Sequence, residues 1–373
     1  MKKHYSQHSR QDIQETAVKK IAGKKGHCLL NLAPRVGKTK IAIDFIKEST
    51  FKKILWVAPS SEIRDKDVPE EFKKWKALTL LKKVTIIHWA SLHKQDFSKY
   101  DFIVLDEYHL ITEKNSIGLI KSKANMLGLS GTHPTEPEKL SILSTLKLRI
   151  AYKLSIDEAV SLGIVSPYRI NIIEFNLDNT KAQIKAGSKT NPFKTTEYKS
   201  YNYLSRRVSQ LLYAGGKGAM FMSLARQRAL HTYPSRMEAA KKILNKISKE
   251  ERTLIFTYEI AQSDELCENT YNSKTDETKY NMFQKEEINR LALVNMASIG
   301  TTFRNMNNCV IVGTNSKAKN FEQKFCRILI PRENYKAEIY ILCAVNTQDE
   351  KWVTSAIQNL NPDNIRYINI KNI

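Results

Sequence analysis

The stretch CLLNLAPRVGKTKIAIDFIKES, residues 28–49, joins a short apolar run to a Gly-Lys-Thr tripeptide and then to a helix-like sequence. A phosphate-binding loop of the type G-x-x-x-x-G-K-[ST] occurs in this context of strand, loop and helix. Backbone N–H groups and the helix amino terminus would face the phosphates, Lys38 would reach the β- and γ-oxygens, and the Thr39 hydroxyl would bind Mg²⁺. The stretch therefore predicts a nucleotide-binding loop.

This loop departs from the common pattern at its first glycine. Ala33 occupies that place, and Arg35 and Val36 make the loop bulkier and more basic than usual. The close approach of the backbone to phosphate depends mainly on the later glycine, Gly37. We therefore expect the loop to bind nucleotide in spite of Ala33.

The rest of the first half repeats the alternation of apolar runs with polar or helix-like stretches. Short runs rich in Ile, Val and Leu are what a parallel sheet buried on both faces requires. We predict a doubly wound α/β domain, with functional residues at the carboxyl ends of its strands. The further predicted strands lie in the runs KKILWVAPS, KVTIIHWAS, YDFIVLDEYH and ANMLGLSGT.

Two adjacent carboxylates, Asp106 and Glu107, follow the apolar run FIVL. Asp106 suits a Mg²⁺ ion, bound directly or through water, and Glu107 could orient or deprotonate an attacking water. The alternative is a solvated acidic loop after a strand. We favour the catalytic interpretation because the Gly-Lys-Thr loop lies upstream.

Composition points to a polyanionic partner. The chain has 373 residues, 42% of them hydrophobic, and its 60 Lys and Arg residues outnumber 38 acidic residues to give a net charge of +22. Neutralising phosphates supplies much of the affinity of proteins for nucleic acid. The alternative is a compositional bias toward Lys, Ile and Asn, as an AT-rich genome favours. The five cysteines show no metal-binding spacing, and we expect them to be reduced.

No apolar run is long enough to span a membrane, and no apolar segment follows the basic amino end. We therefore expect a cytoplasmic protein without a membrane partner, located in the host cytoplasm if a phage encodes it.

The motifs together resemble those of superfamily 2 helicases, the DExH/DEAD-box class of RecA-fold translocases. Residues 33–39 resemble motif I, Asp106-Glu107-Tyr108-His109 resembles the DExH motif II, and Ser130-Gly131-Thr132 resembles motif III. The runs VAPSSEIRD and IIHWASL resemble motif Ia and a later strand-end motif that contacts the nucleic-acid backbone. In the second half, residues 252–266, 288–303 and 308–329 match motifs IV, V and VI in order and approximate spacing.

This resemblance implies two tandem RecA-like domains, each a mostly parallel sheet flanked by helices. The first would cover residues 1–152 and the second residues 236–373, with a connecting segment at residues 153–235. Within that segment, residues 179–212 interleave lysines with aromatic residues. This region could track a strand by charge and base stacking, or it could be an exposed insertion with ordinary helix surfaces.

The resemblance also implies roles for individual residues. ATP and Mg²⁺ would be the cofactors, with Gln14 reading adenine, although Gln11 lies nearby. The implied catalytic residues are Lys38, Asp106, Glu107, Gln323 and Arg327, and the implied metal ligands are Thr39 and Asp106. Nucleotide would further contact Gln14, Ala33, Pro34, Arg35, Val36, Gly37, Lys38, Thr39, Lys40 and Gly300. Nucleic acid would contact Pro59, Ser60, Ser91, Ser130, Thr132, Thr301 and Thr302.

Motif VI departs from the family pattern Q-x-x-G-R-x-x-R. Gln323 and Arg327 are present, but Cys326 replaces the glycine and Ile330 replaces the last arginine. Two arginines normally offset charge at the γ-phosphate in this family, and Arg332 is a candidate for the second. The departure concerns the rate of ATP hydrolysis more than nucleotide binding.

The function that the resemblance implies is ATP-dependent translocation on, or unwinding of, nucleic acid. DNA is favoured over RNA, since the Asp-Glu-Ala-Asp sequence of the RNA group is absent. The compact length is similar to that of phage UvsW-type helicases that remodel branched intermediates, which implies a monomer with recombination or replication proteins as partners. Two alternatives remain: an ATP-driven switch or translocase subunit that does not unwind, and a nucleic-acid binder with a degenerate ATPase.

Overall fold

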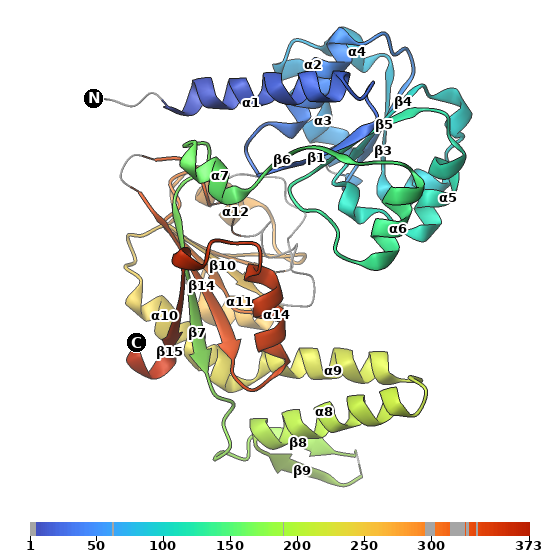
Figure 1. Cartoon of the computed structure of the whole chain (residues 1–373). Helices are drawn as coiled ribbons and strands as arrows, with labels where there is room; N and C mark the ends of the chain where they lie inside the picture. The colour runs from blue at the N-terminus through green and yellow to red at the C-terminus, as the bar shows by residue number, and fades with distance from the viewer. Residues whose placement is uncertain are drawn as a thin grey trace. The chain divides into compact units, whose positions relative to one another are not determined.

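The computed structural model describes residues 5–61, 63–188, 190–294, 303–313, 325, 328–332 and 335–373. The described chain forms two compact units that meet in sequence between Val165 and Ser166 (Figure 1). The predicted connecting segment, residues 153–235, therefore includes the end of the first unit and the beginning of the second. In the described residues, no helix combines the length and the apolar character needed to cross a membrane.

The first unit is built on a six-stranded sheet with the order β3-β2-β4-β5-β1-β6, in which all neighbouring strands are parallel. Every residue of β1 and β2 is buried, because neighbouring strands flank them and both faces of the sheet are covered. The edge strand β3 is only partly buried. The strands are β1 (Cys28–Leu32), β2 (Ile54–Ala58), β3 (Val84–His88), β4 (Phe102–Asp106), β5 (Asn125–Ser130) and β6 (Ile150–Leu154).

Most helices of this unit lie between successive parallel strands in the chain. In α2, five apolar residues between Ile41 and Ile46 are buried, which fixes the helix that follows the Gly-Lys-Thr loop onto the sheet. The helices are α1 (Tyr5–Ala22), α2 (Lys38–Glu48), α3 (Val68–Lys74), α4 (Leu78–Leu81), α5 (Glu113–Lys121), α6 (Pro137–Thr145) and α7 (Ile156–Ser161), with short helical turns at Ile63–Asp67, Trp89–Lys94, Phe97–Lys99 and Tyr108–Leu110.

The second unit contains a seven-stranded sheet with the order β11-β12-β10-β13-β14-β7-β15, again with parallel neighbours throughout. Its strands are β7 (Tyr168–Phe175), β10 (Thr253–Thr257), β11 (Thr270–Tyr271), β12 (Arg290–Val294), β13 (Asn308–Ile311), β14 (Ala337–Ala344) and β15 (Ile365–Asn369). Its helices outside the insertion described below are α10 (Pro234–Lys246), α11 (Ile260–Leu266), α12 (Thr278–Gln284) and α14 (Gln348–Ile357), with short turns at Pro362–Asn364 and Ile370–Asn372.

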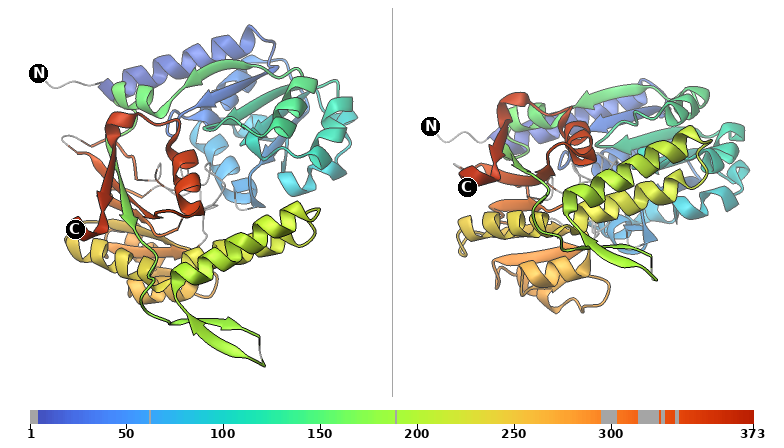
Figure 2. Two further views of the ribbon diagram at one scale, coloured as in Figure 1. Left: turned by 60° about the horizontal axis from the view of Figure 1, so that its bottom comes forward. Right: turned by 90° about the horizontal axis from the view of Figure 1, so that it is seen from below.

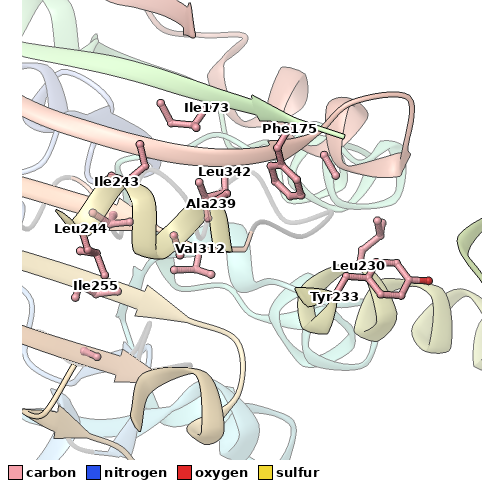
Figure 3. Close-up of a cluster of buried hydrophobic side chains, with 14 of the residues drawn as sticks. Ile173, Phe175, Leu230, Tyr233, Ala239, Ile243, Leu244, Ile255, Val312 and Leu342 are labelled. Carbon is pink, nitrogen blue, oxygen red and sulfur yellow. The ribbon is translucent and has the colours of Figure 1, made fainter. Parts of the chain in front are cut away.

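Helix α10 closes the core of the second unit. Its side chains Ala239, Ile243 and Leu244 pack in one cluster with Ile255 of β10 and Leu342 of β14 (Figure 3). All five side chains are nearly or completely buried, so this cluster holds the helix against the sheet.

An insertion separates β7 from α10. It begins with an antiparallel hairpin, β8 (Ile184–Gly187) and β9 (Pro192–Thr195), and continues as two long helices, α8 (Glu197–Tyr213) and α9 (Ala219–Thr232). These helices run alongside each other and project from the second unit (Figure 2). The sequence left this region undecided between a surface insertion and a strand-binding element.

The prediction of two α/β domains with mostly parallel sheets is confirmed. The predicted strands of the first half are all present, and helix α1 ends at Ala22, immediately before Gly23. Near the carboxyl end, residues 337–353 form β14 and the first turns of α14, which continues the alternation of strand and helix.

Candidate nucleotide-binding site

The predicted nucleotide-binding residues come together at one edge of the first sheet. The loop of residues 33–37 follows β1, Asp106 ends β4, and Ser130 ends β5. Because β4, β5 and β1 are consecutive parallel neighbours, their carboxyl ends meet at the same edge. This is where ligands bind in open α/β sheets.

The loop adopts the left-handed conformation at two positions, Arg35 with a φ of 66° and Gly37 with a φ of 91°. Gln14 of α1 holds this loop, because its side-chain amide donates a hydrogen bond of 2.7 Å to the Val36 carbonyl. A Cβ on Gly37 would lie 2.6 Å from the same amide nitrogen. Gly37 therefore satisfies both the backbone conformation and the close approach of Gln14.

Lys38 begins α2 and reaches back over the end of the sheet. Its ammonium group donates to the Leu32 carbonyl oxygen at 3.2 Å and lies beside Gly131, 3.7 Å from the position of a Cβ on that residue. Its charge lowers the pKa of both Asp106 and Glu107. The cation is thus at the point where the three strand ends converge.

Asp106 lies half-buried at the end of β4, beside the charges of Glu107 and Lys38. Burial, reinforced by the neighbouring charge of Glu107 and opposed by Lys38, raises the pKa of Asp106 to about 7. The indole N–H of Trp89 donates to the Asp106 carbonyl at 2.8 Å, which fixes the backbone here. A bound cation would therefore stabilise the ionised form of Asp106. This is the behaviour expected of a carboxylate that binds Mg²⁺.

Glu107 is held by a network with His109 and Ser130. The Ser130 hydroxyl donates to Glu107 Oε2 at 2.8 Å and lies 2.8 Å from His109 Nδ1, which is itself 3.1 Å from Glu107 Oε2. The one hydroxyl hydrogen of Ser130 is used on Glu107, so a hydrogen on Nδ1 is shared between Ser130 Oγ and Glu107 Oε2, both within reach. Although burial opposes it, bonding to His109 and the charge of Lys38 lower the pKa of Glu107.

The donor set fits a nucleotide phosphate with Mg²⁺. The first amides of α2 and the Lys38 ammonium suit phosphate oxygens, and the Thr39 hydroxyl and Asp106 carboxylate are hard oxygen ligands. Among the described residues, no three His, Cys, Asp or Glu side chains cluster as a protein-only metal site. Mg²⁺ does not need one, since it keeps waters and phosphate oxygens as ligands.

Other residues in and after the loop make contacts within the first unit that hold the loop in place. The Ala33 N–H donates to the Leu154 carbonyl of β6 at 2.9 Å, and the Val36 side chain is buried. Pro34 is half-buried between them. The Lys40 ammonium forms an ion pair with Asp44 at 2.6 Å, which directs it along α2.

The residues predicted to contact nucleic acid in the first unit lie along the same sheet edge. Pro59 and Ser60 follow β2, Ser91 follows β3, and Thr132 follows β5, all half-buried. Ser130 differs because it is completely buried and its hydroxyl bonds to Glu107 and His109.

The remaining predicted site residues, Gly300, Thr301, Thr302, Gln323 and Arg327, lie outside the described residues, as does Cys326. Of the altered motif VI, Ile330 accepts a hydrogen bond from the Ser166 hydroxyl through its carbonyl. Arg332 places its guanidinium over the Tyr335 ring, 3.9 Å from the ring centre.

Two residues at the site were not among the predicted site residues. Trp89 bonds to the backbone of Asp106, and His109 bonds to the Ser130 hydroxyl next to Glu107. The sequence signal for His109 was its place in the Asp-Glu-Tyr-His motif. No sequence signal indicated that Trp89 contacts a residue on another strand.

Comparison with known proteins finds solved structures that have a similar fold. No family model and no curated protein matches the chain. Among solved structures, the Pyrococcus furiosus Hef helicase domain aligns over 93% of this chain and 97% of its own, with a TM-score of 0.51 and 13% identity. This chain has the fold of a helicase domain.

Two further solved structures are similar to this chain over almost its whole length. The Type ISP restriction-modification enzyme LlaBIII, an ATP-dependent enzyme solved bound to DNA, aligns over 96% of this chain with a TM-score of 0.61 and 12% identity, and this chain spans only 31% of it. S. cerevisiae Dbp5, solved bound to RNA and ADP BeF3, aligns over 96% of this chain and 90% of its own, with a TM-score of 0.58 and 9% identity.

Proposed function

We propose that this chain is an ATP-dependent nucleic-acid translocase or helicase. The observation that carries the proposal is the convergence of the Gly37-Lys38-Thr39 loop with Asp106 and Glu107 at one sheet edge, in a chain with two RecA-like units. A phosphate loop, a metal-binding carboxylate and a second carboxylate for water are the parts that phosphoryl transfer from ATP uses.

The roles of these residues follow from their positions. ATP with Mg²⁺ supplies the γ-phosphoryl group and the metal charge. Lys38 neutralises phosphate charge, while Thr39 and Asp106 hold the metal. Glu107, fixed by Ser130 and His109, orients the attacking water.

The remaining assignments belong to the same proposal. Gln14 and Gly300 would contact the nucleotide, and Gln323 and Arg327 of the second unit would respond to the γ-phosphate. Nucleic acid would contact Pro59, Ser60, Ser91, Thr132, Thr301 and Thr302, with Ser130 linking this strand end to Glu107.

We propose DNA rather than RNA as the substrate, with activity of the kind found in phage UvsW-type helicases. The support is the Asp-Glu-Tyr-His sequence in place of Asp-Glu-Ala-Asp. The similar structures include one bound to DNA and one bound to RNA. Substrate choice therefore rests on comparing DNA and RNA as stimulators of ATP hydrolysis.

A second candidate is an ATP-driven switch or translocase subunit that grips nucleic acid without unwinding it. The observation in its favour is Ile330, which stands where the family has the last arginine of motif VI. Turnover without displacement of a labelled strand would distinguish this candidate from a helicase.

The test is phosphate release from ATP with and without single-stranded DNA, duplex DNA and RNA. We expect stimulation by DNA in the native chain. Lys38→Ala and Glu107→Gln should each reduce turnover by roughly 10²–10³-fold, as loss of a transition-state contact does. Lys47→Ala is the matched control, because Lys47 lies on the same helix and its ammonium bonds to the Trp75 carbonyl at 2.9 Å. The motor proposal fails if no polynucleotide stimulates turnover.

A further inference from the structure

The helical hairpin of the second unit, residues 197–232, is hereafter called the arm. Helices α8 and α9 meet at a turn that contains Gly215, Gly216 and Gly218, all with positive φ. The arm projects from the sheet of its unit (Figures 1 and 2). Its far end therefore presents side chains that the core of the unit does not cover.

The charge of the arm and its preceding hairpin is strongly one-sided. Residues 179–232 contain ten Lys and Arg residues and a single acidic residue, Glu197. Glu197 is completely buried, where its carboxylate accepts hydrogen bonds from the backbone amides of Asp178 and Ser235. No carboxylate is therefore exposed on the arm itself, whose residues 197–232 are all described. Such a surface attracts a polyanion.

One face of α8 carries a shallow, open depression, hereafter called the groove. The groove has a volume of about 560 Å³. Its lining residues, single or in adjacent pairs, recur every three to four positions, so they lie on one side of the helix. Hydroxyl, amide and guanidinium groups of this kind are the usual donors to nucleic-acid phosphates and sugars. The lining residues are Tyr198, Asn202, Ser205, Arg206, Ser209 and Gln210.

Tyr213 continues this face toward the tip of the arm. It lies four residues beyond Ser209, and 97% of its surface is exposed. Tyr198 at the other end of the groove is also exposed. The distance along the helix between the two tyrosines is about 22 Å at 1.5 Å per residue, enough for several nucleotides. Exposed aromatic rings beside cations are the elements that bind unpaired bases by stacking.

We propose that the α8 face of the arm binds an unpaired nucleic-acid strand, with Arg206 contacting phosphate and Tyr213 stacking on a base. This inference rests on the proposed function and adds a contact outside the helicase motifs. A duplex fits less well, because its bases are already stacked and leave Tyr213 without a partner ring.

The experiment measures binding of a fluorescein-labelled oligo-dT, and separately oligo-U, to the full chain by fluorescence anisotropy without nucleotide. Tyr213→Ala should weaken binding at least about fivefold, the lower end of what a stacking ring contributes. Arg206→Ala should weaken binding by a similar factor and reduce the slope of log affinity against log salt by about 0.7, as loss of one phosphate contact does.

Two matched controls use residues that the groove does not include. Arg207→Ala removes the same charge from the next position on α8. Arg207 is not among the lining residues of the groove, and its guanidinium donates to the side-chain oxygen of Gln210 at 3.2 Å. Tyr367→Ala removes another exposed tyrosine of the same unit, on β15. Both should change the affinity by less than about twofold. All four side chains are surface residues, so thermal unfolding should confirm that every variant folds.

The proposal is overturned if Tyr213→Ala binds as tightly as Tyr367→Ala, or if Arg206→Ala matches Arg207→Ala. If the same variants weaken binding of a labelled DNA duplex but not of oligo-dT or oligo-U, the proposal is overturned as well. Because the assay contains no ATP, its outcome is independent of turnover. If Tyr213→Ala and Arg206→Ala weaken oligonucleotide binding but the native chain does not hydrolyse ATP, only the motor function is rejected. If the native chain hydrolyses ATP but neither variant weakens binding, only the arm proposal is rejected.

Discussion

Asp106 and Glu107 are neighbours in the chain but occupy different electrostatic surroundings. Burial and the adjacent charge of Glu107 raise the pKa of Asp106 to about 7, although Lys38 opposes the shift. Glu107 receives hydrogen bonds from Ser130 and His109, which together with Lys38 lower its pKa. Two carboxyl groups with separated pKa values can take separate roles in one site. Here we assign metal binding to Asp106 and water activation to Glu107.

This difference predicts a pH dependence of Mg²⁺-nucleotide binding. Metal binding requires the Asp106 carboxylate, so below about pH 7 binding must displace a proton. The affinity for Mg²⁺-nucleotide should therefore rise about tenfold per pH unit and level off above pH 7. The measurement is a titration with a fluorescent ATP analogue across this range. The phosphate itself also titrates near pH 6, so Asp106→Asn is the control, and its affinity should depend less on pH. Equal pH dependence in both proteins would contradict the assignment.

The raised pKa of Asp106 also makes the stability of the folded chain depend on pH. Between about pH 4 and pH 7 the folded chain holds the Asp106 proton while the unfolded chain does not. The contribution of this carboxyl group to the free energy of unfolding is therefore largest at low pH and decreases as pH rises through that window.

At the scale of elements, Arg236 of α10 joins the base of the arm to the second sheet. Its completely buried guanidinium donates to the Leu230 carbonyl of α9 and the Val312 carbonyl after β13, both at 2.7 Å. It also pairs with the buried carboxylate of Asp349 on α14. A single side chain thus satisfies groups on α9, on α14 and at the end of β13.

Removing Arg236 should be far more costly than removing an exposed arginine. Arg236→Ala leaves the buried Asp349 charge without its cation, so we expect the free energy of unfolding to fall by about 3–5 kcal/mol. Urea unfolding provides the measurement. Arg228→Ala is the matched control, because Arg228 forms an exposed pair with Glu259 at 2.8 Å and should cost less than about 1 kcal/mol. Similar losses in the two variants would show that the buried pair does not stabilise the unit.

At the scale of the whole molecule, the net charge of +22 is unevenly distributed. The segment of residues 179–232 carries ten of the 60 Lys and Arg residues but only one of the 38 acidic residues. The structure places these cations largely on the exposed insertion of the second unit. The charge is therefore available to a partner outside the protein.

We predict that nucleic-acid affinity falls steeply with salt. If six or more phosphates are neutralised, affinity should fall about a thousandfold or more between roughly 50 and 200 mM salt. Anisotropy titrations of labelled DNA at several salt concentrations provide the measurement. Binding that is insensitive to salt over this range would show that the positive surface does not contact phosphate.

Much of the scaffold was predictable from local pattern. The apolar runs that became β1, β2, β4 and β5 are continuous because these strands are covered on both faces, and that property is visible in the sequence. The loop before Lys38 and the carboxylates at the end of β4 were predictable because polar residues at strand ends stand out against apolar runs.

The arm was not predictable in the same way. Residues 179–212 show a mixture of lysines and aromatic residues that fits either a surface insertion or a binding element. Whether Tyr213 is a core residue or an exposed one depends on what packs against α8, and this is a property of the folded unit.

The sequence by itself determined that the chain forms two α/β units and that Lys38, Thr39, Asp106 and Glu107 are the candidate residues for phosphate chemistry. Tertiary structure alone decided that β4, β5 and β1 are neighbours, that Gln14 holds the Val36 carbonyl, and that Ser130 and His109 bond to Glu107. The physical reason is that strand and loop formation depend on residues close together in the chain. Strand order, hydrogen bonds between strand ends and pKa values depend instead on contacts and burial that arise only when distant segments pack together.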